Sequence, residues 1–230
     1  MTAGPSASGI FALPGRVMTA RCARHDAEGG CNGWVRMGDA EGMDIHPTPL
    51  PGSALIDLKR LEDDRGFFAR AFCEQEFLDA GLDPTITQCN LSYNHEAGTL
   101  RGFHYQLEPN AEVKVIRCVR GAIFDVIVDL RPDSDTYLQW FGAELSQDNY
   151  KAMYVPRNFA HAYLTLTPDA TTIYQVSTPY TPGAERGLRW SDPTIGVEWP
   201  VEVAHISDKD AAWPLVSENP DFAGTLAEAR

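Results

Sequence analysis

The chain has 230 residues, which is enough for one substantial hydrophobic core and short for two. Its 32 acidic and 19 basic residues give a formal net charge of -13, so most of the surface would repel a nucleic acid. A run of about 20 apolar residues, which a membrane-spanning helix needs, is missing. We therefore expect neither a nucleic-acid nor a membrane partner. A small anionic ligand stays compatible with this charge where several arginines converge.

The five cysteines are odd in number and scattered, at Cys22, Cys31, Cys73, Cys89 and Cys118. With no apolar signal segment in front of them, this usage predicts a reduced, cytoplasmic protein. Cys22, His25 and Cys31 lie close in sequence, but their spacing matches no common zinc site and a fourth ligand is missing. No metal site is predicted there.

The chain divides into a leader, a patterned domain and a tail. Residues 1–45 have no period of 2 or 3.6 and are predicted to be a disordered leader, or a stretch ahead of a functional start at Met43. A helix is predicted at 74–82, and strand-like runs lie at 65–72, 113–120, 122–130, 137–145, 152–156, 160–166 and 171–177. Many short strands with almost no helix predict an all-β sandwich, jelly roll or barrel over 46–216, followed by a tail at 217–230.

Four polar side chains lie in predicted strands, next to or on the same side as apolar residues. His104 lies between Phe103 and Tyr105, and Lys114, Asp125 and Tyr174 share faces with apolar residues of their strands. Each has an ordinary explanation: a hydrogen-bonded core histidine, an edge-strand lysine, an aspartate paired with an arginine, and a strand aromatic. In a jelly roll, however, inward faces converge on one cavity, where histidine, lysine, aspartate and tyrosine would form an acid–base site.

A series of motifs in a fixed order resembles the dTDP-4-dehydrorhamnose 3,5-epimerase family. The motifs run from about Leu55 to Leu215 and are "DDRGFFAR", "QCNLSYN", "TLRGFHYQ", "VKVIRCVRGAIFDVIVDLRPDSDTY", "YVPRNFAHAYLTL", "IYQVSTPYTPGAERGLRWSDPTIGVEWP" and "ISDKDAA". The resemblance implies a cupin double-stranded β-helix (jelly roll) with short peripheral helices, without metal or other cofactor and usually a homodimer. It also implies inversion of C3, C5 or both in a nucleotide-linked 4-keto-6-deoxy sugar.

The resemblance also implies roles for individual residues. His104 matches the catalytic base, Asp210 the carboxylate that orients it, Tyr174 the proton donor, and Lys114 the lysine near the substrate ketone. Substrate contacts are implied for Arg65, Gln88, Asn90, Arg101, His161, Tyr180, Glu185 and Lys209, with Tyr180 stacking on the base. These residue types suit enolate chemistry, since a proton next to a ketone is removed only when charge on the oxygen is stabilised.

Arg70 departs from the family pattern. It stands in "RGFFAR", where the family has a glutamate that contacts the nucleotide, and an arginine can only donate hydrogen bonds. We therefore expect Arg70 to contact substrate and to move nucleotide preference away from strict thymidine recognition.

Two other functions remain open from the sequence. In a metal-dependent cupin oxygenase or isomerase, His104 and His161 would be ligands and Glu108 or Glu112 could add a carboxylate, although Gln106 is a poor ligand. The second alternative is a non-catalytic cupin that binds a sugar nucleotide.

Overall fold

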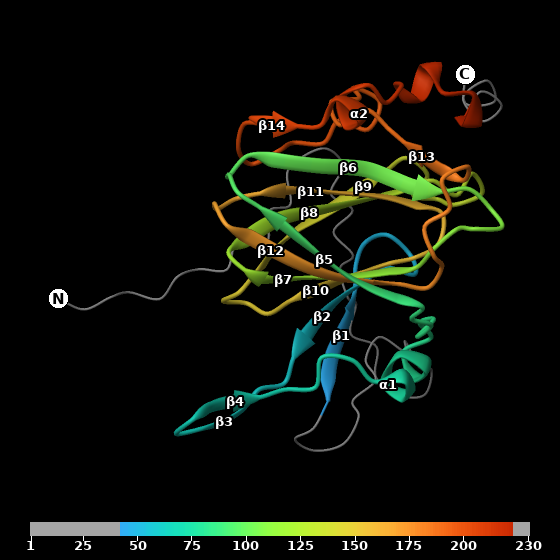
Figure 1. The fold of residues 1–230 in the computed structure, drawn as a ribbon. Helices are drawn as coiled ribbons and strands as arrows, with labels where there is room; N and C mark the ends of the chain where they lie inside the picture. Colours follow the sequence, from blue (N-terminus) through green and yellow to red (C-terminus); the bar gives the residue numbers. More distant parts are fainter. Residues whose placement is uncertain (1–41, 223–230) are drawn as a thin grey trace, which may run out of the picture.

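Two six-stranded sheets face each other in the computed structural model, which describes residues 42–222 (Figure 1). The first sheet has, in spatial order, β1 (Met43–Pro47), β2 (Ala54–Leu58), β10 (Ala152–Val155), β7 (Lys114–Arg120), β12 (Ala170–Val176) and β5 (Gln88–Asn94). The second has β13 (Glu185–Gly187), β6 (Thr99–Gln106), β11 (Phe159–Thr165), β8 (Ala122–Asp129) and β9 (Trp140–Ser146), with β14 (His205–Ile206) parallel to β6. The predicted all-β jelly roll is confirmed.

Short elements surround the sheets. They are the hairpin β3 (Leu61–Asp63) and β4 (Gly66–Phe68), the helices α1 (Glu74–Asp79) and α2 (Asp208–Ala211), and the 3-10 turns η1 (Val216–Glu218) and η2 (Pro220–Phe222). The predicted helix at 74–82 is present as α1. The predicted strand at 65–72 is wrong for most of its length, because only 66–68 are extended and their side chains are exposed outside both sheets. No helix within residues 42–222 is long and apolar enough to cross a membrane.

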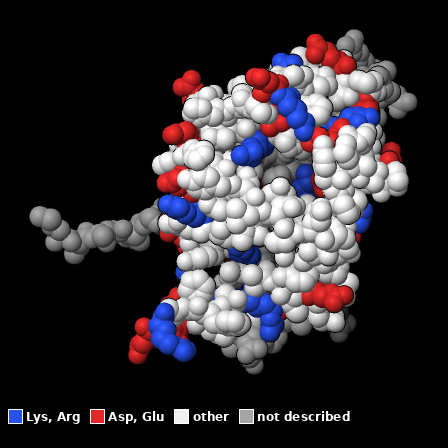
Figure 2. All heavy atoms as spheres, in the orientation of Figure 1, with Lys and Arg blue, Asp and Glu red and all other residues white. Residues whose placement is uncertain are grey.

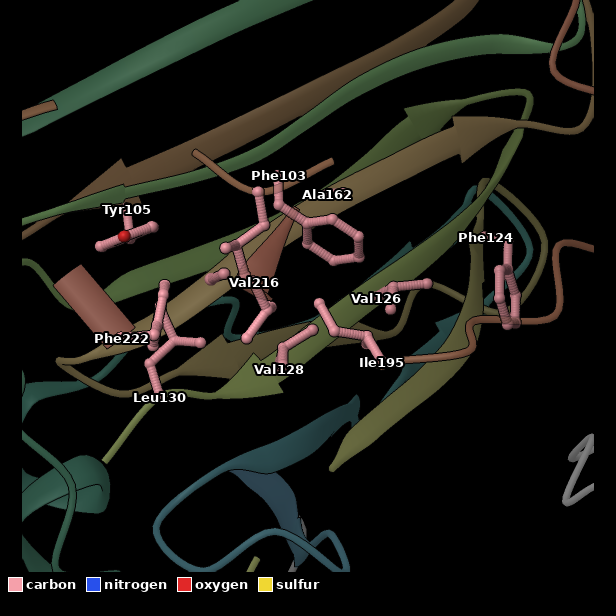
Figure 3. Packing of buried hydrophobic residues seen from close by; sticks show 12 residues of the cluster. Phe103, Tyr105, Phe124, Val126, Val128, Leu130, Ala162, Ile195, Val216 and Phe222 are labelled. Carbon is pink, nitrogen blue, oxygen red and sulfur yellow. The ribbon is translucent and has the colours of Figure 1, made fainter. Parts of the chain in front are cut away.

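Three groups of apolar side chains follow from strand alternation. One fills the space between the sheets and includes Ile116 and Ile127, and another lies between the first sheet and α1, around Phe77. The third lies on the outer face of the second sheet, where Phe103 and its neighbours pack under the C-terminal segment (Figure 3). Because Phe103 is fully buried on that outer side, its neighbour His104 faces the space between the sheets.

The packed domain is wider at both ends than the predicted 46–216. Strand β1 begins at Met43, whose backbone N–H donates to Oε2 of the buried Glu76 over 2.7 Å. At the other end, Val216 and Phe222 are buried in the third cluster, so the chain is packed six residues past the predicted boundary. Apolar residues in a polar tail gave too weak a pattern to predict this. The rest of the predicted leader, and Cys22, His25 and Cys31 within it, lies outside the described residues.

Candidate active site

A bulge in β6 shapes one wall of the site. His104 is the partner of His161 on β11, whereas Tyr163, two residues further along β11, pairs with Arg101, three residues back on β6. The extra residue on β6 is accommodated at Gly102, where φ is 116° and an added Cβ would lie 2.6 Å from the carbonyl oxygen of His161. Only glycine fits this approach. The bulge allows Arg101 to reach Asn94 on β5 while His104 faces inward.

His104 and Asp210 form a close pair at the edge of β6. Nε2 of His104 lies 2.7 Å from Oδ1 of Asp210, and the other carboxylate oxygen accepts from the Gly102 N–H over 3.2 Å. Ser207 caps α2 by accepting from the Asp210 N–H, which fixes the carboxylate at the first turn. Burial alone would raise the pKa of Asp210, but the hydrogen bonds and the nearby charges lower it below its usual value. Asp210 is therefore an anion at neutral pH.

A second histidine–carboxylate pair lies beside the first. Nε2 of His161 is 2.8 Å from Oδ2 of Asp125, which is fully buried on β8. The expectation that Asp125 pairs with an arginine is wrong, because the neighbouring strand β11 presents His161 instead.

Lys114 and Tyr174 come from the opposite sheet. Nζ of Lys114 lies 3.0 Å from Oε1 of Glu112 and donates to the backbone carbonyl of His104 over 3.3 Å. The edge-strand explanation for Lys114 is wrong, since β7 lies between β10 and β12. Tyr174 is half-buried on β12, and burial, followed by the nearby Tyr163, raises the pKa of its hydroxyl. The phenol is thus protonated at neutral pH.

The edge strand β5 and the bulged β6 contribute the next polar side chains. Asn90 lies directly across from Tyr174 in the strand register, and Gln88 lies across from Val176, the residue that also pairs with Lys114. Nε of Arg101 donates to Oδ1 of Asn94 over 2.7 Å, and the arginine side chain remains exposed. Figure 2 shows a hollow on this face of the molecule with basic side chains at its rim.

Tyr180, Glu185 and Lys209 form a network next to His104. Both carboxylate oxygens of Glu185 lie 2.6 Å from Nζ of Lys209, and one accepts from the Tyr180 hydroxyl over 2.9 Å. Burial would raise the pKa of Glu185, but Lys209 and Tyr180 lower it overall. The Tyr180 ring is more than half exposed, so a face of it is free to stack on a ligand.

Two of the predicted substrate contacts lie elsewhere in this chain. Arg65 is exposed in the β3–β4 turn and pairs with Asp63, at the opposite end of the molecule from α2 (Figure 1). Arg70 donates from Nη1 to Oε1 of Glu76 over 2.8 Å, beside α1. The buried carboxylate of Glu76 holds the guanidinium of Arg70 near the first sheet, and the contact of Arg70 with the substrate stays a prediction.

The donor groups needed for a metal-dependent cupin are already used by protein partners. Nε2 of each histidine faces an aspartate, and the amide oxygen of Gln106 accepts from the Thr181 N–H over 2.7 Å. Across residues 42–222, no group of three histidine, cysteine or carboxylate side chains is arranged to hold a metal ion. The metal-dependent alternative is not favoured.

Sequence reasoning missed three residues that support the predicted ones. Glu112 pairs with Lys114 and had been considered only as a metal ligand. Asn94 anchors Arg101, and strand alternation from Asn90 would have placed it on the same face. Trp213 packs edge-on to His104 with 6.4 Å between ring centroids, and no sequence pattern predicted this contact.

The fold and the site together define an all-β protein of the cupin class whose interior carries paired acid–base groups. Residues 47–218 match the family model described as dTDP-4-dehydrorhamnose 3,5-epimerase. The chain belongs to this family and is an enzyme of the isomerase class.

Individual relatives agree with this assignment. The chain is 44% identical over 167 residues to the dTDP-4-dehydrorhamnose 3,5-epimerase of Sinorhizobium fredii (strain NBRC 101917 / NGR234), covering 72% of this chain and 86% of the relative. It is 40% identical to a crystal structure of the enzyme from Bacillus anthracis str. Ames with TDP and PPi bound, with a TM-score of 0.73 and coverage of 76% and 99%. A structure of ChmJ, a 3'-monoepimerase from Streptomyces bikiniensis in complex with dTDP-quinovose, is 31% identical, with a TM-score of 0.72 and coverage of 80% and 96%.

Proposed function

We propose that the cleft between β6 and the strands β7 and β12 inverts one or both carbons next to the C4 ketone of a dTDP-linked 4-keto-6-deoxy sugar. The observation that carries this proposal is the 2.7 Å pair of His104 and Asp210 on the inward side of β6. Family membership supports the substrate class, and relatives bound to TDP and to dTDP-quinovose support thymine as the base.

His104 acts as the general base. Asp210 is an anion, so it accepts a hydrogen bond from Nε2–H of His104, which leaves Nδ1 as the nitrogen that can take a proton from the sugar. The same carboxylate then stabilises the imidazolium that forms. Lys114 lies next to the His104 backbone and supplies positive charge to the oxygen of the enolate as the C–H bond breaks.

Tyr174 delivers the new proton. It projects from the sheet opposite His104, and its raised pKa keeps it protonated until the enolate needs a proton. Removal on one face and delivery on the other inverts the carbon. Exchange with water afterwards returns the imidazole to its neutral form and the phenolate to phenol.

Substrate binding is assigned to groups around the same cleft. Arg101 and Lys209 contact the diphosphate, Tyr180 stacks on the base, and Gln88, Asn90, His161 and Glu185 complete the polar contacts.

A homodimer, in the cytoplasm, is part of this proposal. Leu91 and Val119 are exposed on the outer side of the first sheet, and Arg117 there has a buried Nη1 with no partner within residues 42–222. A second copy would cover these groups, and Arg65 could act in the partner's cleft rather than in its own.

The test is NMR of dTDP-4-keto-6-deoxyglucose in D₂O, read at C3 and C5 separately. We expect deuterium at one or both carbons with the parent protein and none with His104→Asn, because an amide is no base at neutral pH. His205→Asn, an exposed histidine on β14, is the matched control. Exchange at the parent rate in His104→Asn contradicts the assignment, and binding without any exchange by the parent protein identifies a non-catalytic sugar-nucleotide cupin.

A further inference from the structure

Trp213 occupies the space between α2 and β13, next to the His104–Asp210 pair. Its ring meets the His104 ring edge-on, with 6.4 Å between centroids and 72° between planes. Gly187 on β13 is the strand partner of His104, and an added Cβ on Gly187 would overlap the indole ring. The indole therefore lies directly on the backbone of the strand that pairs with His104.

Arg189 holds the chain at Trp213 through two hydrogen bonds. The backbone carbonyl of Trp213 accepts from Nε of Arg189 over 2.5 Å, and the N–H of Arg189 donates to the carbonyl of Pro214 over 3.0 Å. Nζ of Lys209 lies 5.8 Å from the centroid of the indole ring. Trp213 thus connects the segment after β13 with the last turn of α2, the helix that carries Asp210.

The indole nitrogen has an unusual environment. Nε1 of Trp213 is buried and has no hydrogen-bond partner in the described part of the chain. A buried donor without an acceptor is unfavourable, so hydrogen bonding does not account for the ring at this position. What the ring provides is area and shape, filling the gap between Gly187, Lys209 and His104.

We propose that Trp213 is a positioning residue for His104 and Asp210. The ring holds α2 at a fixed distance from β13, keeps the carboxylate in line with Nε2, and excludes water from one side of the pair. This inference rests on the proposed function, in which His104 is the base. It goes further, because it gives Trp213, a residue with no acid–base role, control of the geometry on which the proton transfer depends.

Two substitutions displace the ring by different routes. Trp213→Ala removes it, and Gly187→Ala pushes it away, since a methyl group there overlaps the indole. Each should lower kcat by about 10-fold to 100-fold through misalignment of the base while KM changes little. Trp213→Phe keeps an aromatic ring against Gly187 and removes the unpartnered N–H, so this variant should retain most of the kcat of the parent. Gly183→Ala, where no atom lies within 4 Å of the added methyl, is the matched control.

The double variant Gly187→Ala/Trp213→Ala separates positioning from general damage. With the indole gone, the methyl group has room, so the double variant should be no slower than Trp213→Ala alone. A low-field proton signal from Nε2–H of His104, present in the parent and the Phe variant, should broaden in Trp213→Ala as water reaches the pair. Additive losses in the double variant, an unchanged kcat in Trp213→Ala, or a loss confined to KM would overturn the proposal. Full exchange in His104→Asn would instead overturn the proposed base.

Discussion

Asp210→Asn tests the link between the histidine pair and the chemistry. An amide at this position can still accept from the Gly102 N–H through its oxygen, but its nitrogen then donates to Nε2 of His104. A histidine that accepts at Nε2 carries its proton on Nδ1, the nitrogen that should take the proton from the sugar. The substitution therefore keeps the shape of the site and reverses the tautomer.

The size of the effect follows from the geometry. An imidazolium and a carboxylate about 4 Å apart attract by about 4 kcal/mol at an effective dielectric constant of about 20. Because His104 is 32% exposed, solvent screens part of this attraction, and we take about half of it. A loss of about 2 kcal/mol in the transition state slows the reaction about 30-fold, and the wrong tautomer extends the loss to about 1,000-fold.

The assay is the rate of deuterium incorporation and of product formation, measured for Asp210→Asn beside Asp208→Asn. Asp208 is exposed in the first turn of the same helix, so its variant removes the same charge from α2 without touching His104. We expect the Asp208 variant to match the parent. A rate for Asp210→Asn within about fivefold of the parent would refute the reasoning, because loss of a correctly oriented general base should slow the reaction by more than about fivefold.

Three further predictions concern the donor, the core and the nucleotide. Tyr174→Phe should keep hydrogen exchange by the base but lower epimerised product about 100-fold, measured by NMR, since only opposite-face protonation is lost; equal loss of both signals would exclude the donor role. Asp129→Asn should lower the free energy of unfolding at pH 7 by about 3 kcal/mol in urea, because a fully buried, paired carboxylate is lost, whereas the exposed Asp133→Asn should change little. Burial alone would raise the pKa of Asp129, but its hydrogen bonds lower the pKa overall. The difference in unfolding free energy between the parent and Asp129→Asn is therefore complete above about pH 4 and shrinks as the pH falls further. A constant difference down to pH 2 would contradict this. Arg70→Glu should reduce stability by placing a second carboxylate beside Glu76, and leave the ranking of dTDP-, UDP-, CDP- and GDP-linked substrates unchanged in competition assays; a changed ranking would restore the contact expected from the sequence.

Strand alternation predicted what depends on neighbours in sequence. The period of 2 in "GFHYQ" predicted that Phe103 and His104 point to opposite sides of the strand, and the structure has Phe103 on the outer face of the sheet and His104 on the inner face. The same rule put Lys114 and Tyr174 on inward faces of β7 and β12. The predicted break between two strand-like runs lies at Gly121, whose φ of 70° suits a turn between the strands.

Contacts between distant segments carried no such pattern. Asp210 meets His104 across 106 residues, and only the family resemblance associated them. The bulge at Gly102 depends on the approach of the His161 backbone from another strand. The ion pair of Arg70 with Glu76 was not predicted either, since Glu76 is presented by a helix whose packing against β1 could not be deduced from local sequence.

The charges around the cleft bear on the proposed binding of a diphosphate by an acidic chain. Lys114 and Lys209 each pair with a glutamate, so each ion pair as a whole adds no net charge to the cleft, although Lys114 still presents its ammonium group to an oxygen in direct contact with it. A phosphate can gain from Lys209 only by competing with Glu185, which holds it through both oxygens. Arg101 is different, because its anchor is the neutral amide of Asn94 and its guanidinium keeps a full charge at the exposed end of β6. In a protein of net charge -13, we therefore expect the attraction for a diphosphate to come mainly from Arg101, which the bulge at Gly102 places beside His104.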